Sequence, residues 1–405
     1  MILIFSMIAF NSQANDKMPD STGSELIMQL SEQVRAKYAP DKRTALFELK
    51  KDEKNEGQYM IETTVPAAKT AFERLLEDSG NKTIVEFNVL PDNTVGDKKN
   101  GVVRLSVVDV RYTPANQAEM VTQAIMGTPV DLLKKAGDYY LIRTPEGYIA
   151  WLKGASLTAM DDATFTAWQT SDKLMFTADF GHAFTEADKN SMRVSDLVMG
   201  NLVKLIGNEG DYYKVAYPDG RKAFISMDQA IPYNDWLAQT ELTAENVLRV
   251  AKSMLGVPYL WGGTSVKGVD CSGFTKTSFY MSGLVIPRDA SQQVNSGVDI
   301  DILTNNEVDR NKVLANLKPA DLLFFADRKG RVENPRVTHV AIYLGNGEFI
   351  HASGLVRINS LFEDAANFDG HQARTIVSAK RYLGQSGTQG LDPLVHHPAY
   401  TSLKK

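Results

Sequence analysis

The sequence predicts an α+β protein made of several domains. Its 405 residues are too many for one small module, and the 43% hydrophobic and 23% charged residues are typical of globular proteins. A strand-rich segment occurs twice in the middle of the chain, at 125–152 and at 198–225. From about residue 243 to residue 382, helical and strand patterns alternate. We therefore expect two small β-barrels followed by a mixed domain.

The charge balance and the cysteine count exclude several classes of protein. Lys and Arg number 44 against 49 Asp and Glu, so the net charge is −5 and no broad positive potential would attract nucleic acid or an anionic membrane. Cys271 is the one cysteine. It cannot form an internal disulfide or a cysteine-rich metal site, so its role is packing or reactivity.

The first ten residues, MILIFSMIAF, form an apolar run too short to span a bilayer as a helix. Ser12 and Ala14 suit a signal-peptidase site, although the basic residues that usually precede such a run are missing. We predict a signal peptide over residues 1–14, and export to the periplasm or the cell envelope. A packed or disordered N-terminal segment is the alternative. We expect no transmembrane segment.

Residues 24–104 predict an N-terminal α/β mini-domain, and no sequence pattern in it indicates a function. Strand patterns lie at 44–49 and 83–90, and an amphipathic helical pattern lies at 67–76.

The two repeats share the sequence GDYY, followed by a Pro-Glu-Gly or Pro-Asp-Gly turn between short apolar strands. This punctuation is typical of small antiparallel barrels. The pattern resembles bacterial SH3-like (SH3b) domains, which implies two tandem domains at 105–158 and 175–233. An irregular stretch around 159–177 would join them.

A third domain is predicted at 240–385, and a tail at 386–405 looks extended or poorly ordered. Thr243 is a suitable N-cap for the first helix of this domain, which Gly256 and Pro258 would end.

Cys271 lies where the glycine-rich loop GGTSVKGVD meets a helical pattern. Asp270 is a plausible N-cap, so the thiol would lie in the first helical turn, where the helix dipole and free N–H groups lower its pKa. A lone cysteine is more often an inert core residue. A glycine-rich junction is a poor core position, however, and we predict a nucleophile.

A nucleophilic cysteine needs a base and a group that orients this base. His339 and His351 lie on the two strands of a predicted hairpin with a Gly-Asn-Gly turn at 345–347. A strict two-residue loop would place the two rings on opposite faces of the sheet. A three-residue loop or a bulge would pair His339 with Ser353 and bring both rings to one face. Without that arrangement another side chain would have to orient the base, with Asn359 and Gln372 as candidates.

The residues around this trio resemble the catalytic domain of NlpC/P60 cell-wall cysteine peptidases. The matching segments, in chain order, are VPYLWGG at 257–263, DCSGF at 270–274, IPRDASQQ at 286–293, KPADLLFF at 318–325 and the histidine hairpin. The likeness covers residues 240–385 and implies a papain-like fold. It also implies Cys271 as the nucleophile, His339 as the base and His351 as the orienting residue.

The order SH3b, SH3b, NlpC/P60 resembles γ-D-glutamyl-L-diamino acid endopeptidases, which act on released peptidoglycan peptides. The resemblance implies that Tyr259 lies near the oxyanion, and that Asp270 and Ser272 bind the free amino end of L-Ala. Arg288 belongs to the same substrate-binding set. With these roles, the Cys271 thiolate would attack the γ-amide carbonyl and the oxyanion would bind the Cys271 N–H and the Tyr259 hydroxyl.

The resemblance further implies that the first barrel closes the cleft with an acidic residue and an aromatic residue. Glu119 fits the acidic position, and Tyr148 and Trp151 both qualify as the aromatic one. Arg221 and Phe224 occupy the corresponding positions of the second repeat, so we do not expect the second barrel to share this role. Glu119 and Asp270 together would form an acidic pocket for an ammonium group.

Other functions fit part of the pattern. Cys271, His339 and His351 could hold a catalytic zinc ion, but a cysteine at a helix start beside a glycine-rich loop suits a nucleophile better, so we expect no metal and no other cofactor. A non-catalytic wall-binding protein and a general endopeptidase of intact murein are the alternatives. We expect a monomer that cleaves peptidoglycan-derived peptides, for example during recycling. The sequence leaves open whether lysine or diaminopimelate is the third residue.

Overall fold

The computed structural model describes residues 23–51, 58–330 and 332–401. The chain divides into two compact units, residues 1–90 and 91–405. The signal peptide predicted over 1–14 lies outside the described residues and stays a prediction. Within the described part, no helix is both long enough and apolar enough to cross a membrane.

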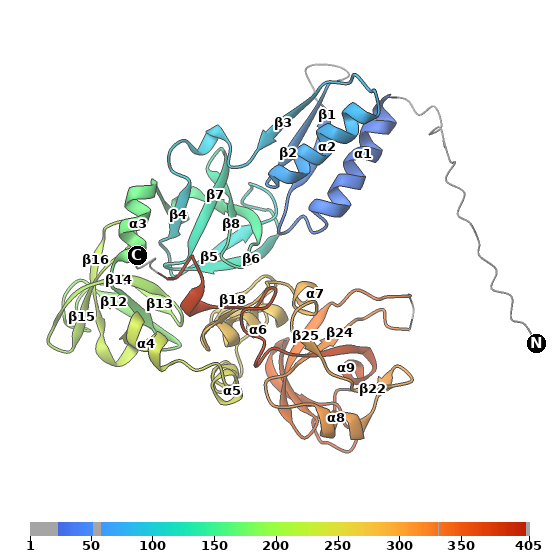
Figure 1. Cartoon of the computed structure of the whole chain (residues 1–405). Helices are drawn as coiled ribbons and strands as arrows, with labels where there is room; N and C mark the ends of the chain where they lie inside the picture. The colour runs from blue at the N-terminus through green and yellow to red at the C-terminus, as the bar shows by residue number, and fades with distance from the viewer. Residues whose placement is uncertain (1–22, 52–57, 331, 402–405) are drawn as a thin grey trace, which may run out of the picture. The chain divides into compact units, whose positions relative to one another are not determined.

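The first unit packs two helices on a small sheet of the order β1-β2-β3 (Figure 1). β1 and β2 are antiparallel, whereas β2 and β3 are parallel and joined by α2, which begins with Pro66 in its first turn. The predicted strands and helix are present, and α1 adds a helix that the sequence pattern did not indicate. The elements are α1 (Gly23–Tyr38), β1 (Phe47–Lys51), β2 (Tyr59–Thr63), α2 (Pro66–Asp78) and β3 (Val85–Val89).

The first repeat lies in a seven-stranded sheet of the order β10-β4-β7-β8-β9-β5-β6. β4 pairs with β7 and with β10, so this barrel begins before residue 105, where we expected it to start. The expected boundary is wrong because the strand pattern of β4 is short and its partners lie far along the chain. The strands are β4 (Asn100–Val103), β5 (Val107–Arg111), β6 (Met120–Ile125), β7 (Pro129–Ala136), β8 (Tyr139–Arg143), β9 (Ile149–Lys153) and β10 (Leu157–Met160).

The second repeat forms a sheet of the order β13-β12-β16-β15-β14-β11-β17. Gly137 and Gly210 of the two GDYY sequences take φ values of 55° and 54° in the corresponding hairpin turns, a conformation that favours glycine. The joining stretch is not wholly irregular, because it contains α3 (Asp162–Thr170). The strands are β11 (Lys173–Phe176), β12 (Phe180–Phe184), β13 (Arg193–Val198), β14 (Leu202–Glu209), β15 (Tyr212–Ala216), β16 (Lys222–Ser226) and β17 (Ala230–Pro232).

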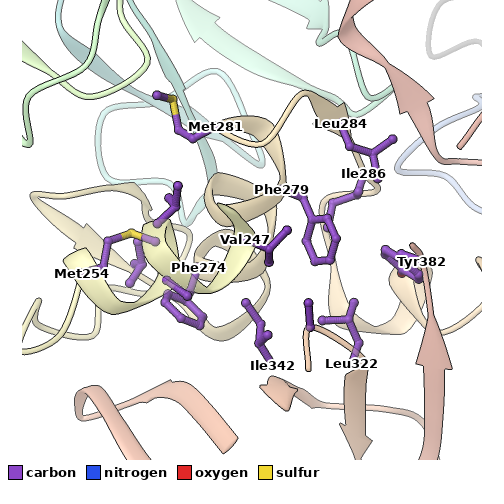
Figure 2. Packing of buried hydrophobic residues seen from close by; sticks show 14 of the residues in the cluster. Val247, Met254, Phe274, Phe279, Met281, Leu284, Ile286, Leu322, Ile342 and Tyr382 are labelled. Carbon is purple, nitrogen blue, oxygen red and sulfur yellow. The ribbon is translucent and has the colours of Figure 1, made fainter. Parts of the chain in front are cut away.

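The third part packs helix α6 against an antiparallel sheet of the order β21-β28-β24-β25-β26-β27 (Figure 1). Figure 2 shows Val247 of α5 between Phe274 and Phe279 of α6, with the sheet residues Leu322 and Ile342 below them, all of them fully buried. The helices are α4 (Tyr233–Gln239), α5 (Ala244–Ser253), α6 (Cys271–Tyr280), α7 (Ala290–Gln293), α8 (Arg310–Asn316) and α9 (Gly370–Thr375). The sheet strands are β21 (Val298–Asp299), β24 (Leu322–Phe325), β25 (His339–Gly345), β26 (Glu348–Ser353), β27 (Leu355–Ser360) and β28 (Ile376–Arg381).

Short two-stranded pairs complete this part of the chain. Thr243 caps α5 as predicted, since its hydroxyl accepts the N–H of Asn246. The short strands are β18 (Thr264–Ser265), β19 (Gly268–Val269), β20 (Leu284–Val285), β22 (Leu303–Thr304), β23 (Glu307–Val308) and β29 (Asp392–Pro393).

The tail expected to be extended or poorly ordered at 386–405 is packed over its described residues. β29 pairs with β20, and Leu391 and Leu394 are fully buried. The expectation was wrong because Gly and Pro content indicates local turns and does not report which apolar side chains find a distant core.

The histidine hairpin combines a two-residue loop with a bulge. Asn346 and Gly347 both have positive φ, 52° and 85°, as in a tight two-residue turn. A register shift between Tyr343 and Gly345 inserts one extra residue, so that Ile342 lies opposite Ile350. Continued along the strands, this register places His339 opposite Ser353, as the catalytic interpretation requires. The bulge, and not a longer loop, sets the side-chain direction.

We predict that Gly347→Ala lowers the free energy of unfolding by about 2–4 kcal/mol, since it combines a strained φ with overpacking. A Cβ at this position would lie 2.4 Å from the ring of Phe362. Gly220→Ala is the matched control: its φ is also 85°, but nothing lies within 4 Å of the added atom. Urea unfolding of both variants measures the difference, and equal losses would contradict the role of the Phe362 contact.

Candidate active site

Cys271 is the first residue of α6, as predicted, and the glycine-rich loop packs directly on this helix start. The Asp270 carboxylate caps the helix by accepting the N–H of Gly273 at 2.6 Å. A Cβ at Gly273 would lie 1.9 Å from the carbonyl oxygen of Gly263, so the two backbones approach more closely than any other residue allows. The glycines of the motif therefore serve close packing around the nucleophile.

The thiol is buried and protonated in the free protein, contrary to the expectation that the helix start lowers its pKa. Its sulfur lies 4.0 Å from the carbonyl oxygen of Thr338, beside the first residues of β25. Burial, reinforced by the negative charge of Asp270, raises the pKa of Cys271 to about 12. The N–H of Val340 and the positive charge of Arg288 act in the opposite direction and are outweighed.

Three side chains form a relay that orients the base. Nε2 of His339 lies 2.8 Å from Nδ1 of His351, and Nε2 of His351 lies 3.0 Å from Oδ1 of Asn359. The amide of Asn359 donates to the carbonyl of Asn367 at 3.0 Å, which fixes Oδ1 as the acceptor. His351 therefore donates from Nε2 and accepts at Nδ1, and His339 donates from Nε2. Nδ1 of His339 is left as the basic nitrogen.

The relay places His339 and His351 on one face, as predicted, and adds a residue that the sequence interpretation kept only as a substitute. Asn359 does not replace His351 but extends it, because β27 brings the asparagine beside β26. Burial lowers the pKa of His339 to about 3 and that of His351 to about 4. Both rings are accordingly neutral near pH 7, and for His351 the acceptor role of Nδ1 requires the same.

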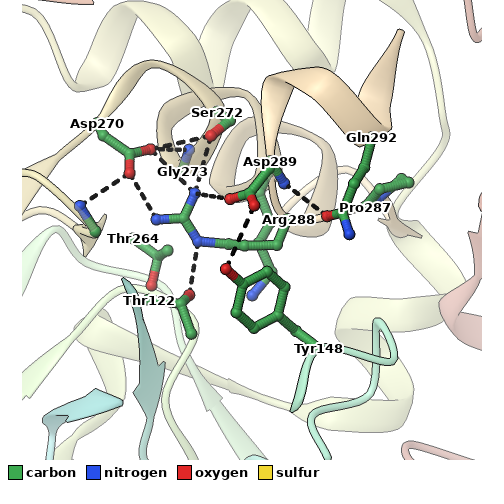
Figure 3. Close-up of polar contacts among 12 residues, drawn as sticks. Thr122, Tyr148, Thr264, Asp270, Ser272, Gly273, Pro287, Arg288, Asp289 and Gln292 are labelled. Carbon is green, nitrogen blue, oxygen red and sulfur yellow. Dashed lines mark hydrogen bonds and ion pairs between the residues drawn. The ribbon is translucent and has the colours of Figure 1, made fainter. Parts of the chain in front are cut away.

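A fully buried guanidinium connects the nucleophile helix to the first barrel (Figure 3). Arg288 holds the Asp270 carboxylate with both terminal nitrogens, at 3.1 and 2.7 Å. It also donates to Ser272 at 2.9 Å and, through Nε, to the hydroxyl of Thr122 on β6 at 2.6 Å. Gly262 N–H adds a further bond to Asp270 at 2.9 Å.

These bonds engage both side chains that were expected to bind the amino end of a substrate, Asp270 and Ser272. The Asp270 side chain is only 10% exposed, and a guanidinium already neutralises its charge. Ser272 donates to the same carboxylate at 3.2 Å and accepts from Arg288. The sequence could not show this, since the partner that neutralises Asp270 is 18 residues away on another element. Arg288 itself is too deeply buried to contact a substrate.

The first barrel contributes two of its three expected residues to the site. Glu119 accepts the indole N–H of Trp261 at 2.9 Å. The Tyr148 hydroxyl donates to Asp289 at 3.3 Å (Figure 3). Trp151 is half-buried on β9, where its backbone pairs with Leu141 and Arg111. Tyr148 is therefore the aromatic residue that reaches the peptidase part.

Asp289 is a site residue that sequence reasoning missed. It follows the buried Arg288 and caps the short helix α7 through a capping box with Gln292. Its side chain is 24% exposed, more than twice as exposed as that of Asp270. The signal was present in the sequence as a second acidic residue beside the arginine, but the difference in burial between the two carboxylates appears only in the structure.

Tyr259 lies near the nucleophile. Its backbone N–H donates to Gly354 at 2.9 Å and it bridges to Val269 just ahead of the helix. Burial raises its pKa, and the nearby Cys271 and Asp270 raise it further. The phenol therefore stays protonated and can donate to a developing negative charge.

Comparison with known proteins agrees with this geometry. Residues 256–374 match the model of the NlpC/P60 family, and residues 110–157 match that of the bacterial dipeptidyl-peptidase Sh3 domain. Residues 256–374 are an NlpC/P60 domain. Together with the relatives described next, this match makes the protein a cysteine peptidase.

Two curated relatives and one solved structure span most of the same length. A γ-D-glutamyl-L-lysine dipeptidyl-peptidase of Bacillus cereus is 29% identical over 60% of this chain and 71% of its own. Dipeptidyl-peptidase 6 of Lysinibacillus sphaericus is 26% identical over 69% and 98%. The crystal structure of an NlpC/P60 family protein from Bacillus cereus has a TM-score of 0.57 at 24% identity, covering 70% of this chain and 99% of that one. This likeness shows the fold.

The zinc alternative fits the ring geometry of the NlpC/P60 domain poorly. The facing nitrogens of His339 and His351 share a hydrogen bond, so these lone pairs are not directed to a common point with Cys271. In the part of the chain that the structure describes, no group of three His, Cys, Asp or Glu residues could hold a metal ion.

We predict that Arg288→Met lowers the free energy of unfolding of the peptidase by about 3–5 kcal/mol, because it leaves Asp270 buried and uncompensated. Arg288→Lys keeps the charge but not the two-pronged geometry, so it should fall between the variant and the wild type. Denaturant unfolding provides the measurement. Arg310→Met removes an exposed ion pair with Asp364 and should leave the midpoint unchanged. Arg288→Met as stable as this control would contradict the proposed importance of the pair.

The neutral histidine pair predicts a pH dependence of stability. Both pKa values lie below the ordinary value of 6.5, so below pH 6.5 the unfolded chain binds more protons than the native one. Stability should therefore be full above about pH 6.5 and fall towards pH 4, by up to about 1.4 kcal/mol per pH unit for each ring. Unfolding midpoints between pH 7.5 and 4.5 measure this slope. His351→Gln removes one ring and should reduce it; an unchanged slope would show that His351 does not contribute.

Proposed function

We propose that this cysteine peptidase cleaves the γ-D-glutamyl–L-diamino acid bond of peptidoglycan peptides that carry a free N-terminal L-Ala. The observation that carries the proposal is the pair of carboxylates, Asp289 and Glu119, at the junction between the first barrel and the nucleophile's domain. Tyr148 and Trp261 bond to them from opposite sides of this junction. The names of the relatives support the same bond, and their likeness includes the barrel as well as the peptidase domain.

The amino end of the peptide would bind at Asp289 and Glu119, in place of the Asp270 pocket first expected. Asp289 is the more exposed of the two carboxylates, 24% against 10%, and its contact with Arg288, at 3.9 Å, is longer than the two bonds that Arg288 makes to Asp270, at 3.1 and 2.7 Å, so Asp289 is the better placed to bind an ammonium group. An enzyme that recognises the ammonium group and cuts two residues further on would release L-Ala-γ-D-Glu. This recognition distinguishes the proposed enzyme from a general endopeptidase of intact murein.

Attack would start from a neutral thiol and a neutral imidazole. As the sulfur of Cys271 adds to the γ-carbonyl carbon, Nδ1 of His339 takes the thiol proton. The oxyanion would accept bonds from the Cys271 N–H and the Tyr259 hydroxyl. His339 then protonates the leaving α-amine of the diamino acid, and the C–N bond breaks to leave a thioester.

Deacylation would use the same groups in reverse. His339, neutral again, removes a proton from water as the oxygen adds to the thioester carbon, and the proton returns to the sulfur when the C–S bond breaks. His351 and Asn359 keep Nε2 of His339 protonated throughout, which holds Nδ1 in the basic state. Because such peptides occur in the cell envelope, we propose that the protein acts there. We propose a monomer, since one chain supplies every catalytic and binding group named above.

We expect rapid cleavage of L-Ala-γ-D-Glu-L-Lys or its diaminopimelate counterpart, and a drop in kcat/KM of about 30- to 1000-fold when the L-Ala amine is acetylated. The range corresponds to the loss of one charge-assisted hydrogen bond, with two carboxylates left facing an acyl group. Product analysis by liquid chromatography and mass spectrometry gives the bond cut, and comparing lysine with diaminopimelate gives the third residue.

Four variants and a chelator make this experiment decisive. Cys271→Ser provides the blank, and EDTA should leave the rate unchanged. Asp289→Asn and Glu119→Gln should lose activity on the free peptide and little more on the acetylated one, while Trp151→Phe should resemble the wild type. Equal turnover of free and acetylated peptides would sink the amine pocket and favour a general wall endopeptidase. No turnover of any peptide would favour the wall-binding alternative.

A further inference from the structure

Residues 391–401, here called the C-terminal strap, are anchored on the peptidase domain. Asp392 and Pro393 form β29 on β20, and Leu394 N–H donates to the carbonyl of Gly283 at 2.9 Å. Leu391 and Leu394 are fully buried. The strap therefore moves with the NlpC/P60 domain and starts from a fixed base.

From this base the strap reaches a turn of the first barrel. Nε2 of His397 lies 3.2 Å from the carbonyl oxygen of Pro145, and Nδ1 accepts the N–H of Ala399 at 3.1 Å. Since Nδ1 accepts, Nε2 carries the proton and donates to Pro145. His397 is 7% exposed and its ring lies 5.5 Å from that of Tyr400, so the bond is shielded from water.

The same turn is held from the other side by the nucleophile helix. The carboxylate of Glu146, 3% exposed, lies 2.7 Å from the ammonium group of Lys276 on α6. Tyr400 of the strap also packs on Tyr280 of this helix, with ring centroids 5.7 Å apart. The space left between these groups is about 40 Å³, enough for a few waters and not for a peptide. The junction is a contact between parts and not a second binding site.

Movement of this turn would be transmitted to Tyr148. Two hydrogen bonds between Thr144 and Tyr148 close the turn. The Thr144 N–H donates to the Tyr148 carbonyl at 2.9 Å, and the Tyr148 N–H donates to the Thr144 hydroxyl at 3.2 Å. The Tyr148 hydroxyl in turn donates a hydrogen bond to Asp289. Pro145 and Tyr148 are thus two ends of one short rigid loop, with the strap at one end and the site at the other.

We propose that the C-terminal strap is a positioning element: His397 holds the turn at 144–148, and thereby Tyr148, against the substrate-binding edge of the peptidase domain. The proposal rests on the proposed function in that Tyr148 and Asp289 bind the peptide. His397 touches neither substrate nor Cys271, so its effect is on substrate binding and not on the chemical step.

The test compares His397→Ala with His396→Ala in the full-length protein. His396 is the exposed neighbour of the same residue type, which makes it a matched control. Loss of the His397 bond should raise KM about three- to tenfold with kcat within about twofold, the range that loss of one shielded hydrogen bond gives. His396→Ala should behave as the wild type. His397→Gln restores a donor at the position of Nε2 and should recover part of the loss.

Hydrogen exchange of the turn provides a readout that does not depend on activity. Exchange at the amides of Gly147 and Tyr148 should become several-fold faster in His397→Ala and stay unchanged in His396→Ala. Alkylation of Cys271 by iodoacetamide should proceed at the same rate in both. If His397→Ala fails to fold, His397→Phe fills the volume without a donor and takes its place.

The outcomes separate the two proposals. Unchanged exchange at the turn in His397→Ala, or a loss confined to kcat, overturns the positioning role of the strap. Faster exchange supports the strap even if the wild-type protein cleaves no γ-D-glutamyl peptide, a result that would overturn the proposed function alone.

Discussion

The buried ion pair between Arg288 and Asp270 is the interaction on which the catalytic end of the molecule depends. Removing both charges from water is costly, and the cost is offset only because every prong of the guanidinium and both carboxylate oxygens have partners. Through these partners one carboxylate caps the nucleophile helix and holds the glycine-rich loop at Gly262, while the guanidinium reaches Thr122 of the first barrel. Loop, helix and barrel therefore meet at a single buried charge pair.

Burial is the main reason that the nucleophile is neutral before substrate binds, and the negative charge of Asp270 adds to it. The burial of the site also keeps His339 and His351 unprotonated. In such a site the base waits as a neutral imidazole in the correct tautomer, and the cysteine and histidine do not form a thiolate–imidazolium ion pair. The tautomer is set at the far end of the relay, where Asn359 can accept only because its amide donates to Asn367. The orientation of one amide thus decides which nitrogen of His339 is basic.

The two barrels have the same strand order but different relations to the site. In the first, the turn after β8 carries Glu146 and Tyr148, which contact the peptidase domain at Lys276 and Asp289. In the second, the position that corresponds to Tyr148 is Arg221, whose guanidinium stacks on Tyr217 and pairs with Asp219 within its own barrel. The two barrels therefore share a scaffold, and the residues of one turn bring only the first barrel into these contacts with the peptidase domain.

The sequence by itself determined the features that depend on neighbours in the chain. The cap at Asp270, the glycines around Cys271, the alternating strands of the repeats and the two histidines on one hairpin all follow from local spacing, and the likeness to NlpC/P60 peptidases follows from the same residues. Only the tertiary structure decided the bulge before Gly345, which turns both rings to one face. It also decided the pairing of Asp270 with Arg288, the extension of the relay to Asn359 and the return of the tail to Pro145. The physical reason is common to all four: register, burial of charge and contacts between distant segments depend on what lies opposite a residue in space, and a pattern along the chain does not carry that information.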